Sequence, residues 1–228
     1  MSPPIEASAR RLRWSAACRI VPTRYPSVFL YDRVADAQDF EALYALEAMT
    51  NDRVRDEAGE IELVAPGDRI FGPGSGPIMA AFTHVNPDGS RFSDGSYGMF
   101  YAGRERRTGI AETQYHLSRF LAATGEAAMH LQMRLYHVAI DARLHDLRGP
   151  GPALAALHDP DRYAAPRAAG ATLRAAGSLG VVYRSVRDPR GECVGLFKPR
   201  AASGCVHAAH LLYAWDGKSF TDTYARLP

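Results

Sequence analysis

Gly89-Ser-Arg91-Phe-Ser-Asp-Gly-Ser-Tyr-Gly98-Met-Phe-Tyr101-Ala102 leads from a turn-rich segment into a short apolar run. The part before Gly98 consists mainly of Gly, Ser and Asp, which are residues that turns favour. The run 98–103 is apolar and bounded by glycines, so it predicts a buried strand. Arg91 therefore precedes a strand that carries Tyr101.

A helix is predicted directly after this strand. Thr108 can cap its N-terminus, apolar residues recur at helical spacing through about residue 123, and Gly125 supplies a C-terminal stop. Glu112 falls in the first two turns of that helix. The chain thus presents an arginine, a tyrosine on a strand and a carboxylate near a helix start, in that order.

Further elements follow from periodicity and from the positions of Gly and Pro. We expect a helix over 36–52 with Asp36 as its N-cap, a helix over 166–176, and either a helix or a strand over 78–84. Strands are expected over 18–22, 27–31, 129–140, 181–186, 193–197, 206–215 and 219–224, and a proline-punctuated loop over 143–166. Because the strands gather in the second half and mostly do not alternate with helices, the pattern favours an α+β fold over a doubly wound sheet.

Composition narrows the class of protein. The chain has 228 residues, of which 46% are hydrophobic and 23% charged, so an ordinary packed core is expected. A net charge of +2 is too small to indicate direct nucleic-acid binding. Cys18, Cys193 and Cys205 have neither disulfide-framework nor zinc spacing. The first residues lack the pattern of a signal peptide and no apolar run is long enough to span a bilayer, so neither secretion nor membrane insertion is expected. We expect a cytoplasmic protein with reduced cysteines and no membrane contact.

Several common site motifs are missing. The loop Gly72–Pro77 lacks the ending of a phosphate-binding P-loop, Ser75 is not in a nucleophile elbow, and no Rossmann fingerprint occurs. There is no H-E-x-x-H, and His207 and His210 are three apart on an expected strand, where they would point to opposite faces. We therefore expect no metal site, and any dinucleotide would be a substrate held by another fold.

Arg91 and Tyr101 each admit two interpretations. The guanidinium of Arg91 can offer its planar fork to a diphosphate or a ribose hydroxyl, or it can simply pair with Asp88 or Asp94. The ring of Tyr101 can stack on a base or on nicotinamide, or it can be an ordinary core residue with a satisfied hydroxyl.

Glu112 and Ser185 are equally open when taken singly. A carboxylate near a helix N-terminus is stabilised by the helix dipole, by roughly 0.3–1 kcal/mol. It would also stabilise the positive charge that forms on a ribose when an N-glycosidic bond breaks. Ser185 can bind a ribose hydroxyl, hold Glu112 in place, or meet a backbone carbonyl.

Taken together, these motifs resemble the RES-domain family, named for its Arg, Glu and Ser. The resemblance is carried by the segments Cys18-Arg-Ile-Val-Pro22, Ser90-Arg-Phe-Ser-Asp-Gly95, Tyr101, Ile110-Ala-Glu112 and Gly180-Val-Val-Tyr-Arg-Ser-Val-Arg187. It runs from about Arg19 to Trp215, so we expect one RES-type domain over 1–228 with its core at about 19–215. Members of the family include toxins of bacterial type II toxin–antitoxin pairs of the Xre–RES kind.

The resemblance implies a fold similar to ADP-ribosyltransferases, with NAD+ as substrate. By position, Arg91 matches the arginine that holds the nucleotide, Tyr101 the aromatic residue near nicotinamide, Glu112 the catalytic acid and Ser185 the family serine. Arg19 matches a further position near the pocket. Ser93 and the segment 163–167 depart from the family pattern, which puts the acceptor and the pocket shape in question.

The resemblance also implies partners. An antitoxin with a helix-turn-helix domain is expected to cover the site, and the ADP-ribosyl group is expected to go to a protein acceptor, to water or to phosphate. The alternative is a binding module with the same fold that grips a nucleotide or a partner without catalysis.

Overall fold

The computed structural model describes residues 7–25, 27–34, 36–47 and 56–226. Seven strands form one sheet in the order β1-β2-β5-β4-β3-β6-β7, and β1 also pairs with β3. The strands are β1 (Ala9–Pro22), β2 (Phe100–Gly103), β3 (Met129–Asp146), β4 (Gly180–Arg184), β5 (Glu192–Leu196), β6 (Ala202–Trp215) and β7 (Phe220–Arg226). The helices are α1 (Ala37–Glu47), α3 (Gly76–Thr83), α4 (Arg106–Thr124), α5 (Pro152–Leu157) and α6 (Ala164–Ala175). None of the helices within these residues has the length and apolar character needed to cross a bilayer.

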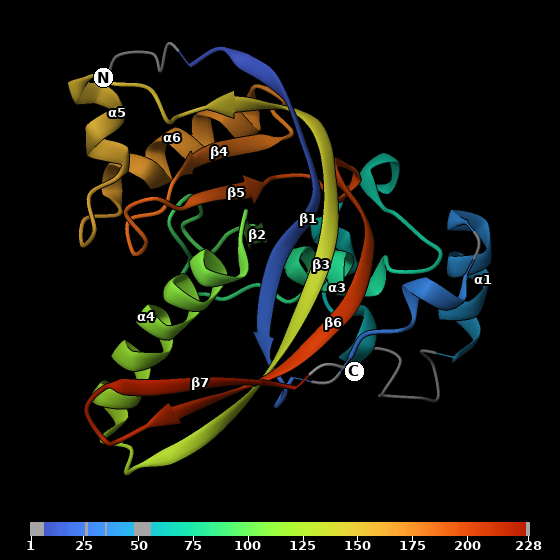
Figure 1. Ribbon diagram of the computed structural model, residues 1–228. Helices are drawn as coiled ribbons and strands as arrows, with labels where there is room; N and C mark the ends of the chain where they lie inside the picture. The colour runs from blue at the N-terminus through green and yellow to red at the C-terminus, as the bar shows by residue number, and fades with distance from the viewer. Residues whose placement is uncertain (1–6, 26, 35, 48–55, 227–228) are drawn as a thin grey trace.

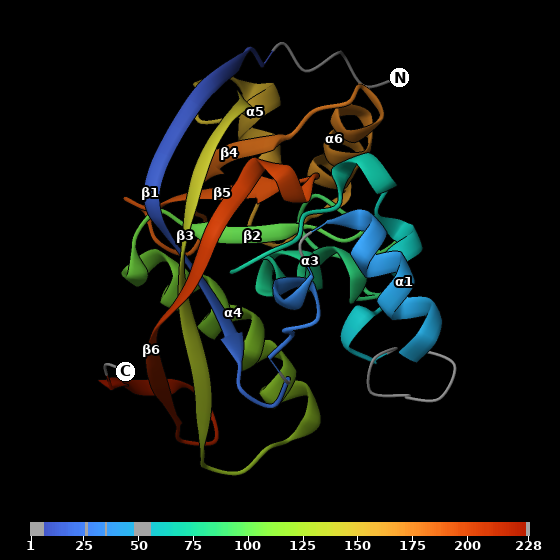
Figure 2. The ribbon, with the colours of Figure 1, turned by 90° about the vertical axis from the view of Figure 1, so that its right-hand side faces the viewer.

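The strands fall into a long group and a short group. Antiparallel pairing joins β1, β3, β6 and β7 over most of their length, and β2, β5 and β4 pair antiparallel with one another. The groups meet at the single pair Cys18 with Gly103 and at a two-residue parallel pairing of β3 with β4. Figure 1 shows β4 and β5 crossing the long strands β1 and β3, and Figure 2 shows β2 in the same crossing layer.

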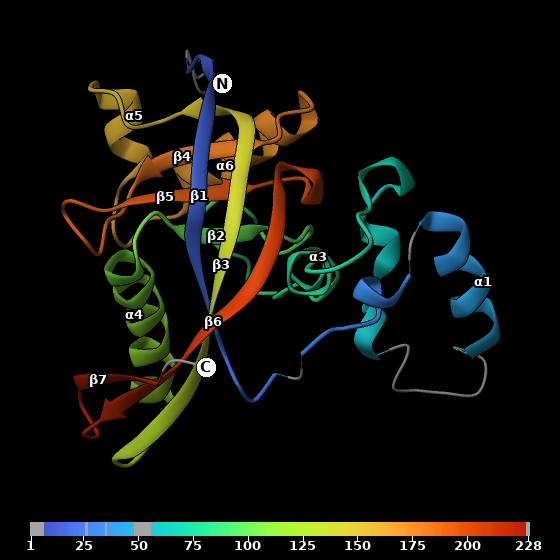
Figure 3. The ribbon, with the colours of Figure 1, turned by 45° about the vertical axis from the view of Figure 1, so that its right-hand side comes forward.

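Three apolar clusters fill the spaces around the strands. The largest lies where the long and short strands face each other and includes Trp14, Phe100, Ile140, Val182 and Val194. A second covers the other face of β2, β5 and β4, against α5 and α6. A third packs α4 on the far half of β1, β3 and β6. Figure 3 shows α4 beside β7 at one side and α5 and α6 next to β4 and β5. Because side chains alternate along a strand, each short strand contributes to both the first and the second cluster.

The expected α+β class, with a β-rich core and flanking helices, is confirmed. Asp36 does cap the first helix, since its Oδ1 accepts the backbone N–H groups of Gln38 and Asp39. Residues 48–52 of that expected helix lie outside the described residues. Gly125 ends α4 in the left-handed conformation with φ of 67°, as a glycine C-cap does. The segment 78–83 is helical, as part of α3. Thr108 does not cap α4, because the helix starts at Arg106 with Glu105 as its N-cap, and the Thr108 hydroxyl instead donates to Asp188 Oδ2 at 2.8 Å.

Three further expectations were wrong. Residues 27–31 form no strand, because the chain turns into a short 3-10 helix at Tyr31–Arg33 whose Tyr31 ring stacks on Phe40. The expected loop 143–166 contains the end of β3, helix α5 and the start of α6. His207 and His210 do not point apart: a bulge in the pairing of β3 with β6 changes the alternation, and the two rings lie 4.4 Å apart.

Candidate functional site

Glu112 and Ser185 meet although they are 73 positions apart. The Ser185 hydroxyl donates to Glu112 Oε1 over 2.6 Å, and the Cys193 thiol lies 3.9 Å from the same oxygen. Glu112 is in the second turn of α4, and Ser185 directly follows β4. The carboxylate therefore lies at the end of the short strands, on the face that carries the second apolar cluster.

The hydrogen bonds of Ser185 hold its hydroxyl in position to donate to that carboxylate. Its side chain is 6% exposed, and its oxygen accepts the backbone N–H of Arg187 at 3.1 Å and of Asp188 at 2.9 Å. A hydroxyl has two acceptor positions and one donor, so both acceptor positions are filled and the proton is directed to Glu112. Of the roles considered for Ser185, the geometry favours holding Glu112 in place over binding a ribose.

Arg91 is buried rather than paired with Asp88 or Asp94. It is 6% exposed, and its Nη1 donates to the backbone carbonyls of Leu157 at 3.2 Å and Asp159 at 2.9 Å. Its guanidinium carbon lies 4.7 Å from the centre of the Tyr163 ring. The segment 157–163, from the last residue of α5 to the residue before α6, thus supplies these contacts.

Tyr101 lies on the same face of the short strands. Its hydroxyl is 2.8 Å from the Ser90 Oγ and accepts the Phe92 N–H at 3.1 Å, so it holds the segment that carries Arg91. Burial raises the pKa of this phenol, which therefore stays protonated. Its ring lies over Gly195, where an added Cβ would be 3.0 Å from the ring.

Tyr183 is a site residue that the sequence interpretation missed. It stands two positions before Ser185, so strand alternation places both on one face. Burial raises the pKa of its phenol well above the ordinary value, and the nearby charge of Glu112 raises it further while that of Arg91 lowers it. Tyr183 thus lies near both the carboxylate and the arginine, and its ring meets the Phe92 ring edge-on with the two centres 5.1 Å apart. The period of two in Tyr183-Arg-Ser185 was the signal that could have identified it.

Arg19 lies apart from these four residues. Its guanidinium stacks 4.5 Å from the centre of the Phe100 ring, on the side of the first cluster, and its Nη1 donates to the backbone carbonyl of Tyr101 at 3.2 Å. Burial lowers the pKa of Arg19 to about 10. Its side chain is therefore on the opposite face of β2 from the Tyr101 ring.

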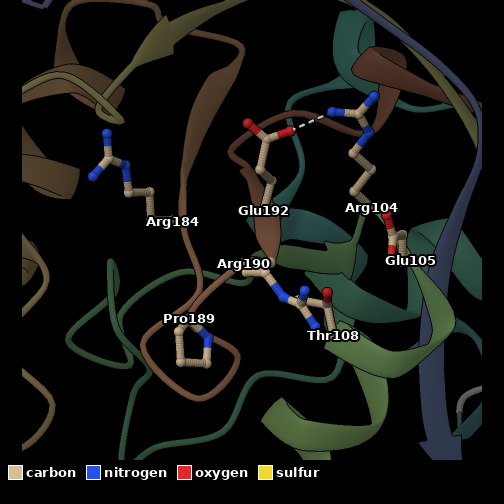
Figure 4. Close-up of a pocket in the computed structure, with 8 residues that line it drawn as sticks. Arg104, Glu105, Thr108, Arg184, Pro189, Arg190 and Glu192 are labelled. Atoms are coloured by element: carbon tan, nitrogen blue, oxygen red, sulfur yellow. Dashed lines mark hydrogen bonds and ion pairs between the residues drawn. The ribbon is translucent and has the colours of Figure 1, made fainter.

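A polar cavity of about 360 Å³ lies beside the start of α4 and is lined by none of the five expected residues. Its lining includes Arg104, Thr108, Arg184, Arg190 and Glu192, and Figure 4 shows Arg104 pairing with Glu192 across it. Arg184 and Glu192 alternate with Tyr183 and Cys193 along β4 and β5, so they point to the other face. This cavity is separate from the Glu112 site. Among the described residues, no three His, Cys, Asp or Glu side chains gather closely enough to hold a metal ion.

Comparison with protein families gives a match to the RES domain over residues 68–216. The chain belongs to the RES domain family. The match contains Arg91, Tyr101, Glu112 and Ser185, whereas Arg19 precedes it.

Two further proteins are similar to this RES domain chain. The uncharacterized protein y4oC of Sinorhizobium fredii (strain NBRC 101917 / NGR234) is 27% identical over 212 residues, which cover 91% of this chain and 86% of that protein. The crystal structure of the M. tuberculosis MbcT-MbcA toxin–antitoxin complex contains a chain that aligns over 97% of this one and 88% of its own length. The TM-score is 0.48 and the identity 11%.

Proposed function

We propose that this RES domain protein cleaves the nicotinamide–ribose bond of NAD+ and acts as the toxin of a type II toxin–antitoxin pair. The fold is then expected to work as an ADP-ribosyltransferase-like one, with NAD+ as substrate. The proposal is supported above all by one observation, the 2.6 Å hydrogen bond that fixes the Glu112 carboxylate beside Ser185.

Cleavage of the nicotinamide–ribose bond is favoured by a fixed negative charge near the ribose. When the bond between the ribose carbon and the nicotinamide nitrogen breaks, both electrons leave with nicotinamide, which becomes neutral, and the ribose becomes oxocarbenium-like. A carboxylate held by a hydrogen bond stabilises that charge without having to reorient. The nucleophile, which is water, phosphate or a side chain of an acceptor protein, then forms the new bond to the ribose carbon. Attacking water releases a proton as this bond forms.

Arg91 and Tyr101 have complementary roles in this proposal. Arg91 is assigned to the diphosphate, because a guanidinium fork fits phosphate oxygens in a bidentate manner. Tyr101 is assigned to the nicotinamide side of the pocket and also holds the Ser90–Phe92 segment on either side of Arg91 through its hydroxyl. Arg19 is assigned a supporting role behind the strand, where it binds the carbonyl of Tyr101.

The acceptor and the partner complete the proposal. ADP-ribose is transferred to a protein or released to water or phosphate, and an antitoxin with a helix-turn-helix domain is proposed to cover the site. One bond breaks in all these reactions, so the nucleophile admitted to the pocket distinguishes them.

The test uses purified protein and NAD+ labelled in its adenylate part, with and without cell extract. Free nicotinamide with no labelled protein indicates transfer to water or phosphate, and a labelled protein band indicates a protein acceptor. Glu112→Gln is expected to lower nicotinamide release about 10²–10³-fold. Glu126→Gln, which neutralises an exposed carboxylate just past α4, is the matched control and is expected to be unchanged. No nicotinamide release from the unaltered protein would refute the proposal and favour a binding module.

A further inference from the structure

A second arginine stands beside the Glu112 site. Arg187 follows Ser185 by two positions, and its backbone N–H donates to the Ser185 hydroxyl oxygen at 3.1 Å. Its guanidinium carbon lies 3.2 Å from the centre of the Tyr115 ring, which is on α4 three residues after Glu112. Arg187 is therefore anchored by its backbone to the residue that holds the carboxylate.

The donors of Arg187 are only partly used. Its Nη2 donates to the backbone carbonyl of Pro160, whereas its Nε is buried and has no hydrogen-bond partner among the described residues. A buried N–H without a partner is rare, since it has lost its hydrogen bond to water and gained none in return. Within the described part of the chain, Arg19 and Arg134 also have a buried Nε without a partner, but that of Arg187 lies next to the residue that holds Glu112, so it leaves a donor at the site for an acceptor such as a phosphate oxygen.

Arg91 binds the same segment. It donates to the carbonyls of Leu157 and Asp159, as Arg187 does to that of Pro160. Each guanidinium also lies over a tyrosine ring, Tyr163 for Arg91 and Tyr115 for Arg187. Two stacked arginines thus converge on backbone oxygens within residues 157–160.

Stacking determines what such arginines bind. With one face of the guanidinium covered by a ring, the N–H groups at its edge are held in place and pre-organised for planar, bidentate acceptors. Neutral carbonyl oxygens occupy several of these donors in the structure. Phosphate oxygens carry formal charge, and charge-assisted hydrogen bonds are roughly twice as strong as neutral ones.

We propose that Arg187 is a second diphosphate-binding residue, which forms with Arg91 a two-arginine clamp, and that the 157–160 segment is the internal occupant that a diphosphate displaces. This inference rests on the proposed function and deepens it, because it specifies a substrate with two adjacent phosphates. It also makes the loop between α5 and α6 a determinant of substrate affinity.

One further contact holds the loop, and it can be removed while the ring that stacks on Arg187 is kept. The Tyr115 hydroxyl donates to Asp161 Oδ1 at 3.3 Å, so it holds the loop on α4. Tyr115→Phe keeps the ring under Arg187 but removes this bond. The clamp therefore predicts opposite effects for the two substitutions, weaker diphosphate binding for Arg187→Gln and tighter binding for Tyr115→Phe.

The experiment measures ADP-ribose binding by titration calorimetry and KM for NAD+ by nicotinamide release, with folding checked by circular dichroism. Arg187→Gln is expected to weaken ADP-ribose binding and raise KM about 10–100-fold, the size expected for loss of a charge-assisted hydrogen bond, and Arg187→Lys to fall between it and the unaltered protein. Tyr115→Phe is expected to tighten ADP-ribose binding about 2–5-fold, because the loop is released from one weak hydrogen bond. Arg190→Gln removes an equal charge at an exposed position that contacts neither the loop nor Glu112, and is expected to leave both values unchanged.

The outcomes separate the clamp from the proposed reaction. If NAD+ is cleaved but folded Arg187→Gln binds ADP-ribose as the unaltered protein does, the clamp is refuted and the reaction stands. If no nicotinamide is released but Arg187→Gln still weakens ADP-ribose binding, the clamp stands and the reaction is refuted. If Arg190→Gln weakened ADP-ribose binding as much as Arg187→Gln does, the loss of one positive charge would explain both effects, and the clamp would be refuted.

Discussion

Ser185 directs the Glu112 carboxylate, so its removal is expected to reduce turnover more than binding. Ser185→Ala leaves Glu112 Oε1 without its 2.6 Å donor and leaves the N–H groups of Arg187 and Asp188 without an acceptor. We expect kcat for nicotinamide release to fall about 10–100-fold, because small misplacements of reacting groups have effects of that size. The free energy of unfolding is expected to fall by about 1–3 kcal/mol.

Ser185→Thr separates the two effects, because it retains the hydroxyl. We expect kcat to recover most of its value in this variant, with KM near that of the unaltered protein. Equal kcat values for the Ala and Thr variants would show that the hydroxyl does not position Glu112.

Gly195 gives a second prediction at the scale of one residue. An added Cβ would lie 3.0 Å from the Tyr101 ring and 3.2 Å from the Met99 methyl, so the ring would have to move. Gly195→Ala is expected to lower the unfolding free energy by about 1–3 kcal/mol, as overpacking does, and to raise KM for NAD+. The unfolding free energy is measured by urea titration. Gly67→Ala, where no atom lies within 4 Å of the new Cβ, is the control. Equal losses in both variants would contradict this account of Gly195.

Much of the candidate site was predictable from residue types and order, but its contacts were not. Arg91, Tyr101, Glu112 and Ser185 were named from motifs, and Glu112 and Ser185 do meet. The carbonyl oxygens that accept hydrogen bonds from Arg91 belong to residues 157 and 159, about 66 positions away, in a segment whose sequence has no clear periodicity. Such contacts depend on how a loop crosses the fold, which local pattern does not encode. Strand alternation alone could have identified Tyr183.

At the scale of elements, helix α6 sets the position of the segment that carries Arg91. Gly170 faces Phe92, and an added Cβ would lie 2.0 Å from the Phe92 carbonyl oxygen. Ala favours a helix over Gly by about 1 kcal/mol, but a backbone oxygen at this distance cannot yield without moving the helix. Gly170→Ala is therefore expected to lower the unfolding free energy by about 1–3 kcal/mol and to weaken ADP-ribose binding.

Ala171→Gly provides the contrast, because residue 171 is exposed on the same helix. It is expected to lose only about 1 kcal/mol, from helix propensity, and to bind ADP-ribose normally. If Gly170→Ala were more stable than the unaltered protein in urea, α6 would not pack on Phe92 as described.

The elements themselves were predictable to the extent that they are long and periodic. Helix α4 and strands β3 and β6 were found, although their ends shifted by several residues. Helix α5 was missed because its six residues, Pro152–Leu157, are too few to show a helical period within a proline-rich stretch. The pairing of β1 with β3 joins residues more than 100 positions apart, and no local signal specifies such a partner.

At the scale of the whole molecule, we expect the ion pairs that connect the long and the short strands to make stability depend on pH. Arg148 binds Asp146 at the end of β3 at 2.7 Å and Glu192 at the start of β5 at 2.6 Å, with all three side chains at most 26% exposed. Hydrogen bonds from Arg148 lower the pKa of Asp146. Burial alone would raise the pKa of Glu192, but hydrogen bonds from Arg104 and Arg148 outweigh it and lower that pKa too.

Both folded-state pKa values lie below the unfolded values near 4, so this stabilisation is complete above that range and is lost as pH falls through the folded-state values. Arg148→Met is expected to lower the unfolding free energy by about 1–2 kcal/mol at pH 7, and the difference from the unaltered protein should shrink below about pH 4. Urea unfolding followed at both pH values measures this. Arg11→Met removes a pair with Asp141 whose side chains are 59% and 49% exposed, so its effect on the unfolding free energy should be smaller than that of Arg148→Met at pH 7. A difference for Arg148→Met that is the same at both pH values would mean that these carboxylates do not link the two groups of strands through their charge.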